Sequence, residues 1–113
     1  MNVPCFSGGT VVLVHGLWMN GLELSMLGHR LRHEHGYDVR TFSYPTMSGV
    51  AADICRDLAA FATSVAGGGR THFVGHSLGG VLVHRTLVEC GAGRLDGNAV
   101  LLGAPLNGSK AAR

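Results

Sequence analysis

The chain has 113 residues, of which 46% are hydrophobic and only 14% are charged, and its formal net charge is +2. This length supports one hydrophobic core, so we expect a single domain over residues 1–113 with little stability to spare. A net charge this small, carried by scattered basic residues, argues against nucleic acid or an anionic membrane surface as a partner. No apolar run reaches membrane-spanning length and the N-terminus MNVPCFSGG does not resemble a signal peptide, so we expect a cytoplasmic protein without stable membrane insertion.

Strand and helix patterns alternate along the chain. Strands are predicted where β-branched residues cluster, and helices where apolar residues recur at helical spacing. The predicted strands are a run from Thr10 that ends at His15, then Tyr37–Ser43, a run from Thr71, and Ala99–Gly103. The predicted helices run from a cap at Asn20, with Glu23 three residues on, to Gly36, from a cap at Ser48 to residues 67–69, and from Leu78 to Cys90. Their apolar faces, assigned to the core, are Leu24, Leu27 and Leu31 in the first helix and Val50, Ile54, Leu58, Phe61 and Val65 in the second.

This alternation is typical of the α/β class, a mostly parallel sheet with helices on both faces. Right-handed crossovers would bring the carboxyl ends of the strands to one edge of the sheet. Residues that follow different strands are therefore expected to meet at that edge.

The segment THFVGHSLGG, from Thr71 to Gly80, joins an apolar run to a G-x-S-x-G motif centred on Ser77. In a nucleophile elbow the chain leaves a strand, turns sharply and enters a helix, which holds the serine at φ > 0 at the tip of the turn. Gly75 and Gly79 lie where a Cβ would collide with the folded-back backbone, and Gly80 lets the helix pack close to the sheet. A chain with 18 glycines can contain a bare motif by chance, so the strand and helix around it carry the prediction that Ser77 is a nucleophile.

A second motif, TVVLVHGLWMN, ends its strand in His15 and Gly16. Acyl transfer to a serine creates an oxyanion, which preorganised backbone N–H groups stabilise. Gly16 lets the chain bend, so the N–H of Leu17 is one predicted donor, and the N–H of Leu78, directly after Ser77 at a helix N-terminus, is the other. An ordinary strand-to-loop turn would explain this segment alone, but the two motifs in this order indicate an oxyanion hole.

Three segments resemble the α/β-hydrolases, in particular their lipase and esterase branch. Val11–Trp18 is similar to the third strand and oxyanion loop of that family, and Phe73–Gly80 to the fifth strand and nucleophile elbow. Val100–Ser109 is similar to the sixth strand and the Gly-Thr-Pro-His-x-Gly-Ser turn of bacterial lipases, with Ala104 and Leu106 where threonine and histidine are common. The resemblance implies hydrolysis of small-molecule or lipid carboxylic esters through an acyl-serine intermediate, without a cofactor or metal. It covers nearly the whole chain but only the first half of a typical family domain, so we expect a partial α/β-hydrolase fold, truncated at its C-terminus.

No residue is recognisable as the base or the acid that would complete a triad with Ser77, which the family carries in the order serine, acid, histidine. After Ser77 the only histidine is His84, seven residues along the helix and so about 10 Å up its axis. His76 is expected to point elsewhere, and His15 to brace the oxyanion loop. The acids after Ser77 are also poorly placed for this role: Glu89 and Asp96. We therefore expect the isolated chain to hydrolyse p-nitrophenyl esters poorly. A thioesterase, an acyltransferase, and a non-catalytic fragment or interaction module stay open as alternatives.

The remaining candidate residues are assigned structural roles. His29 and His33 are spaced to share a helix face, but without acidic or cysteine partners nearby we expect no metal there. Asp53 and Asp57 are assigned to a solvated helix face. The three cysteines are odd in number and widely spaced, which favours reduced thiols over disulfides or zinc ligands: Cys5, Cys55 and Cys90. The strand Ala99–Gly103 would have a bare outer edge, so we expect self-association through it.

Overall fold

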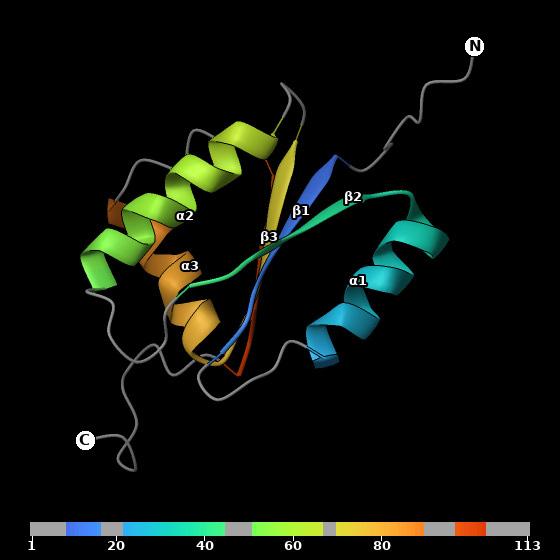
Figure 1. Ribbon diagram of the computed structural model, residues 1–113, viewed down its shortest axis with the longest axis horizontal. Helices are drawn as coiled ribbons and strands as arrows, with labels where there is room; N and C mark the ends of the chain where they lie inside the picture. The colour runs from blue at the N-terminus through green and yellow to red at the C-terminus, as the bar shows by residue number, and fades with distance from the viewer. Residues whose placement is uncertain (1–8, 17–21, 45–50, 67–69, 90–96, 104–113) are drawn as a thin grey trace.

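The computed structural model describes residues 9–16, 22–44, 51–66, 70–89 and 97–103 (Figure 1). Strands and helices alternate through this part of the chain, as predicted. The elements are β1 (Thr10–Val14), α1 (Leu22–His35), β2 (Asp38–Phe42), α2 (Ala51–Val65), β3 (Thr71–His76), α3 (Leu78–Glu89) and β4 (Ala99–Leu102). The predicted α/β class is confirmed, and the predicted boundaries hold to within two residues wherever they fall on described residues.

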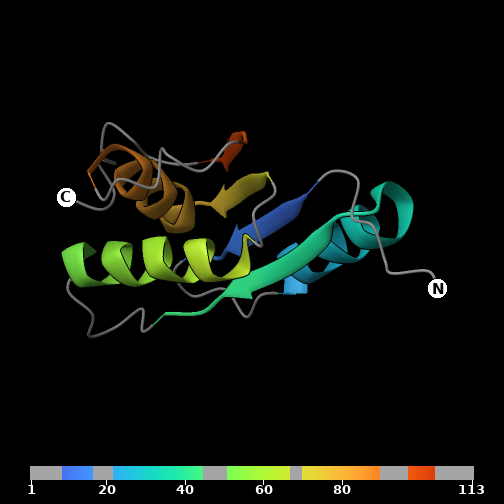
Figure 2. The ribbon, with the colours of Figure 1, turned by 90° about the horizontal axis from the view of Figure 1, so that it is seen from above.

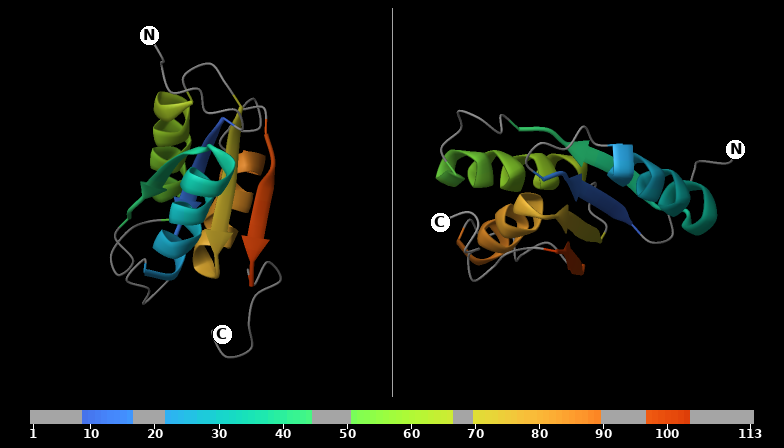
Figure 3. Two further views of the ribbon diagram at one scale, coloured as in Figure 1. Left: turned by 90° about the vertical axis from the view of Figure 1, so that its right-hand side faces the viewer. Right: turned by 90° about the horizontal axis from the view of Figure 1, so that it is seen from below.

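The strands form one parallel sheet in the order β2-β1-β3-β4. The helix α1 covers one face of this sheet, while α2 and α3 cover the other (Figures 1 and 2). Viewed from the α1 side, the four strands lie side by side with β2 and β4 at the two edges (Figure 3, left). Because all strands run in the same direction, the residues that follow β1, β2 and β3 lie together at one end of the sheet, where the strands finish. We call this end the carboxyl edge, and it carries the two motifs found in the sequence.

The core consists of two layers, one on each side of the sheet. β1 is buried along its whole length because its side chains alternate between the layers, as expected for an internal strand of a parallel sheet. The layer between the sheet and α1 contains Val11, Leu13, Leu24, Val39 and Val74. The layer under α2 and α3 contains Val12, Val14, Phe42, Tyr44, Ile54, Cys55, Leu58, Ala62, Phe73, Leu82 and Val83.

The predicted apolar faces of the helices are confirmed where the structure describes them. Leu24, Ile54 and Leu58 are buried, and the other predicted positions pack partly buried against the same layers: Leu27, Leu31, Phe61 and Val65. The helix α1 ends before Gly36, which has φ 73°. The predicted caps Asn20 and Ser48, and Val50 with them, lie outside the described residues.

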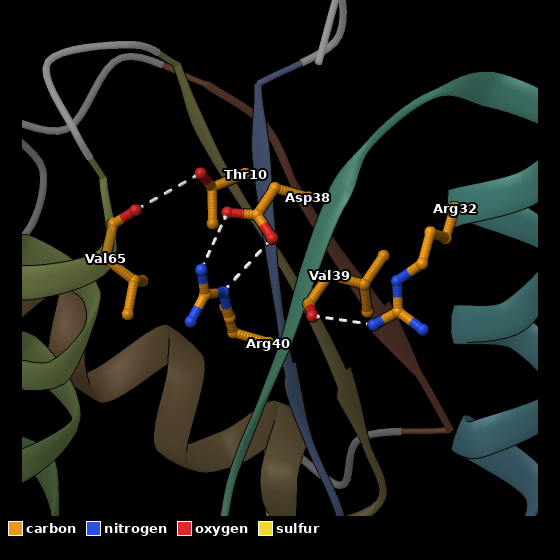
Figure 4. Close-up of polar contacts among 6 residues, drawn as sticks. All are labelled: Thr10, Arg32, Asp38, Val39, Arg40 and Val65. Atoms are coloured by element: carbon orange, nitrogen blue, oxygen red, sulfur yellow. Dashed lines mark hydrogen bonds and ion pairs between the residues drawn. The ribbon is translucent and has the colours of Figure 1, made fainter. Parts of the chain in front are cut away.

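Polar contacts fasten both helical layers to the sheet (Figure 4). The hydroxyl of Thr10 at the start of β1 donates to the carbonyl of Val65 at the end of α2, over 3.3 Å. On the other side, the guanidinium of Arg32 in α1 donates to the carbonyl of Val39 in β2, over 3.0 Å. Each contact gives a backbone carbonyl a hydrogen-bond donor, and both contacts help to hold the helices against the sheet.

The edge strand β4 is exposed, as expected. Val100 and Leu102 retain 49% and 39% of their accessible surface, whereas Val74, the partner of Val100 in β3, retains 8%. An exposed apolar edge strand is a site for pairing with another chain. Self-association of this protein therefore stays a prediction with a defined surface.

Two further expectations concern thiols and membranes. Cys55 is a buried free thiol between α2 and α3, while Cys5 and Cys90 lie outside the described residues. None of the helices in the described ranges is long and apolar enough to cross a membrane.

Candidate active site

Ser77 lies between the last residue of β3 and the first residue of α3, with φ 57°. Within the described ranges it is the one residue other than glycine with positive φ. The left-handed conformation costs an L-residue roughly 1–2 kcal/mol, so it persists only where the surrounding packing enforces it. This is the backbone geometry predicted for the serine of a nucleophile elbow.

The glycines around Ser77 are required by close backbone approaches. A Cβ on Gly75 would lie 2.6 Å from the carbonyl oxygen of Gly79 and 2.6 Å from the Cα of Gly80. A Cβ on Gly79 would lie 2.5 Å from the carbonyl oxygen of His15, and closer still to that of Val14. These separations are shorter than van der Waals contact, so only glycine fits at both positions. The same glycines let the first turn of α3 pack against the end of β1.

Hydrogen bonds hold the backbone of Ser77 on both sides. Its N–H donates to the carbonyl of Leu102 at the end of β4, over 2.8 Å. Its carbonyl accepts from the N–H of Gly80, over 2.9 Å, and from that of Val81, over 3.4 Å. The elbow is therefore tied to the neighbouring strand and to the first turn of its own helix.

The predicted oxyanion donors are described only in part. Leu78 is the first residue of α3, and the first N–H groups of a helix have no acceptor within the helix and carry its positive dipole end. Leu17 lies outside the described residues. His15 and Gly16 are described, and they follow β1, which pairs with β3 so that Val14 lies opposite Gly75. The parallel register thus brings the two predicted motifs to neighbouring positions at the carboxyl edge.

His15 is held in place by three contacts. Its Nδ1 lies 3.0 Å from the carbonyl oxygen of Gly16, and because a carbonyl can only accept, Nδ1 carries the proton in this contact. Its ring stacks on the ring of Tyr44, with centroids 4.6 Å apart and an angle of 10° between the planes. The hydroxyl of Tyr44 donates to the carbonyl of His15 over 2.6 Å. These contacts fit the bracing role expected of His15.

Tyr44 was not among the residues that the sequence pattern selected. It lies just past the end of β2, outside both motifs, and only the pairing of β2 with β1 brings it to His15. Tyr44 is 8% exposed, and burial raises the pKa of its hydroxyl to about 12. A polar aromatic residue directly after a strand was the one signal in the sequence, and this signal is weak.

The described histidines do not supply an identified base. His76 shares a sheet face with Val74, which faces α1, and its Nδ1 is buried without a hydrogen-bond partner among the described residues. His84 is exposed on α3, seven residues beyond Ser77. Among the described residues, no histidine is hydrogen-bonded to the hydroxyl of Ser77. Glu89 forms an exposed ion pair with Arg85, and Asp96 lies outside the described residues.

The other candidate residues show no ligand arrangement. His29 and His33 pack on each other with ring centroids 4.2 Å apart, and no group of three potential metal-ligating side chains occurs within the described ranges. Asp53 forms an ion pair with Arg56 on the exposed face of α2.

A groove of about 210 Å³ lies on the α1 side of the sheet. Its lining includes Val11, Leu31, Tyr37, His72 and Asn98. Val11 and His72 are second in their strands, so the groove lies toward the amino ends of the strands, away from Ser77. Ligands of open α/β sheets bind at the carboxyl ends. We therefore do not assign this groove to the candidate active site.

A serine at a strained strand-to-helix turn, at the carboxyl edge of a parallel sheet with helices on both faces, is the arrangement that defines one class of protein. The sequence family described as "Alpha/beta hydrolase family" matches residues 11–113, and the chain belongs to this α/β-hydrolase family. A search of curated proteins finds no match.

Proposed function

We propose that this chain carries the nucleophile and the oxyanion-binding elements of a serine hydrolase that cleaves carboxylic esters, of the lipase or carboxylesterase type. The observation that carries the proposal is the position of Ser77, at φ 57° between β3 and α3 and beside the end of β1. Family membership agrees with a hydrolase scaffold. The substrate is a small-molecule or lipid ester.

In the proposed reaction, the Oγ of Ser77 attacks the carbonyl carbon of the ester and gives its proton to a base. The negative charge that develops on the carbonyl oxygen is stabilised by the N–H of Leu78 and, as the second proposed donor, that of Leu17. The bond to the alcohol then breaks, and the alcohol leaves with a proton. Water attacks the acyl-serine, which releases the acid and regenerates the hydroxyl of Ser77.

No described residue is identified as the base that accepts the proton of Ser77. An unassisted serine hydroxyl is a weak nucleophile near neutral pH. Oxyanion binding and substrate binding alone leave about 10³ to 10⁴ of rate enhancement over water when triad members are absent. We therefore propose that the 113-residue chain by itself is a slow catalyst, and that an external base accelerates acylation of Ser77.

Thioesterase and acyltransferase activities use the same serine and oxyanion donors, and differ from the proposed activity in the leaving group or the acceptor. A non-catalytic interaction module would keep the fold without reactivity at Ser77.

A reducing, cytoplasmic environment is also part of the proposal, and the buried free thiol of Cys55 supports it.

The test measures reaction of Ser77 with a fluorophosphonate probe and hydrolysis of p-nitrophenyl butyrate, each with and without imidazole as an external base. The parent chain, Ser77→Ala and Ser64→Ala are compared. Ser64 is a matched control because its hydroxyl is exposed on the last turn of α2 and donates to the carbonyl of Phe61 over 2.7 Å. We expect the probe to label the parent and Ser64→Ala slowly and Ser77→Ala not at all, with imidazole raising the labelling rate of the first two.

Two results would contradict the proposal in different ways. Equal labelling of the parent and Ser77→Ala would remove the nucleophile. Fast ester hydrolysis without imidazole, lost in Ser77→Ala and also in His84→Ala or His15→Ala, would show that the chain is a complete catalyst with a base that we did not recognise.

A further inference from the structure

Tyr44 contacts His15 of the predicted oxyanion loop, which consists of His15 and Gly16, and no motif in the sequence indicated this contact. Its hydroxyl donates to the carbonyl of His15 over 2.6 Å, and its ring lies nearly parallel to the imidazole of the same residue, with centroids 4.6 Å apart. One side chain thus holds both the backbone and the side chain of His15.

The contact passes from His15 to the next peptide unit. Nδ1 of His15 donates to the carbonyl oxygen of Gly16 over 3.0 Å. The orientation of the His15 ring and the position of the Gly16 carbonyl are therefore coupled.

The side chain of Tyr44 is itself supported from beneath. It is 8% exposed, and its ring packs on that of Phe42, with centroids 6.2 Å apart and an angle of 19° between the planes. Phe42 in turn packs on Phe61 of α2, with centroids 5.4 Å apart. The carbonyl oxygen of His15 also lies close to the backbone of α3, because a Cβ on Gly79 would lie 2.5 Å from it. The end of β1 is thus held between a buried aromatic column and the first turn of the elbow helix.

We propose that Tyr44 is a positioning residue of the candidate active site, which holds the backbone of His15 and Gly16 in place beside Ser77 and the first turn of α3. The proposal rests on the proposed function, because it needs Ser77 to be the nucleophile. Its structural part, the grip of Tyr44 on His15, can be measured without any activity.

The variant Tyr44→Phe removes the hydroxyl and keeps the ring. Tyr37→Phe is the matched control, since Tyr37 contacts His72 edge-on beside the groove at the other end of the sheet, with ring centroids 5.6 Å apart. Circular dichroism and thermal unfolding establish that both variants fold. A third variant, Tyr44→Leu, removes the stacking as well as the hydrogen bond.

Two readouts are compared. The first is the ¹³C resonance of the His15 carbonyl, which reports directly on the hydrogen bond that it accepts. The second is the rate of fluorophosphonate labelling of Ser77 in the presence of imidazole, with Ser77→Ala as background. We expect the resonance to move in Tyr44→Phe and not in Tyr37→Phe, and the labelling rate to fall about fivefold to tenfold in Tyr44→Phe, further in Tyr44→Leu, and not in Tyr37→Phe.

Each other outcome overturns a defined part. An unchanged His15 carbonyl resonance in Tyr44→Phe would show that the hydrogen bond does not exist in solution. A shifted resonance with an unchanged labelling rate would make Tyr44 a packing residue only, and would remove the positioning role. A parent that is labelled no faster than Ser77→Ala would refute the proposed function, and with it the catalytic part of this proposal, while the resonance still reports the grip on His15.

Discussion

The positive φ of Ser77 predicts that this protein is less stable than it would be with glycine at the same position. Ser77→Ala and Ser77→Gly both remove the hydroxyl, so their difference isolates the backbone conformation. The left-handed conformation costs alanine roughly 1–2 kcal/mol, whereas glycine adopts it freely. Glycine loses about 0.5–1 kcal/mol more conformational entropy than alanine on folding. We therefore expect Ser77→Gly to be the more stable of the two by about 1 kcal/mol.

The measurement is urea unfolding followed by circular dichroism, with thermal unfolding in parallel. A difference of about 1 kcal/mol corresponds to a rise in the midpoint temperature of about 4 °C for a domain of this size. The slope of the urea dependence should be equal in the two variants, because they expose similar surface on unfolding. The matched control is the same exchange at Ala60, which is exposed within α2. There the parent is the alanine form, and Ala60→Gly should lower the free energy of unfolding by about 1 kcal/mol.

The opposite signs at the two positions make the test decisive. If Ser77→Gly were equal to or less stable than Ser77→Ala, while Ala60→Gly behaved as expected, the strained elbow would be refuted. The structural basis of the proposed function would then be removed as well.

Three further predictions concern packing, pH and association. Gly79→Ala should lower the free energy of unfolding by about 1–3 kcal/mol and by more than Gly28→Ala, because a Cβ on Gly79 meets fixed backbone carbonyls whereas one on Gly28 meets a movable methyl group of Leu13 at 3.0 Å. Urea unfolding measures both variants, and a larger loss of stability in Gly28→Ala would contradict this prediction. Because burial raises the pKa of Tyr44 from 10.0 to about 12, its neutral form stabilises the fold fully below pH 10 and progressively less as the pH rises through 12. The free energy of unfolding should therefore fall less steeply over that interval in Tyr44→Phe than in the parent, and an equally steep fall would show that other groups cause it. Light scattering should show a mass that rises with concentration for the parent and rises less for Val100→Lys on the edge strand, whereas Val88→Lys, at a residue that is 70% exposed on α3, should behave like the parent. A parent that stays monomeric at high concentration would contradict association through β4.

Local patterns in the sequence were sufficient to predict the elements of the fold. The β-branched runs and the helical spacing of apolar residues are short-range signals. They identified every described strand and helix, with boundaries to within two residues where these fall on described residues. The elbow was predictable for the same reason. A small set of neighbouring residues, Gly75, Ser77, Gly79 and Gly80, is enough to produce a sharp turn with positive φ, and the structure has φ 57° at Ser77.

Local sequence is thus enough to specify which residues form strands, helices and the turn at Ser77, since these depend on contacts within a few positions. The surroundings of that turn depend on tertiary packing. The order β2-β1-β3-β4 places the end of β1 beside Ser77, Tyr44 against His15, and the carbonyl of Leu102 on the N–H of Ser77. The partners in these contacts are 25 or more residues apart, and they meet because parallel strands can pair only after a helical crossover has closed the chain between them. No local pattern encodes such a meeting.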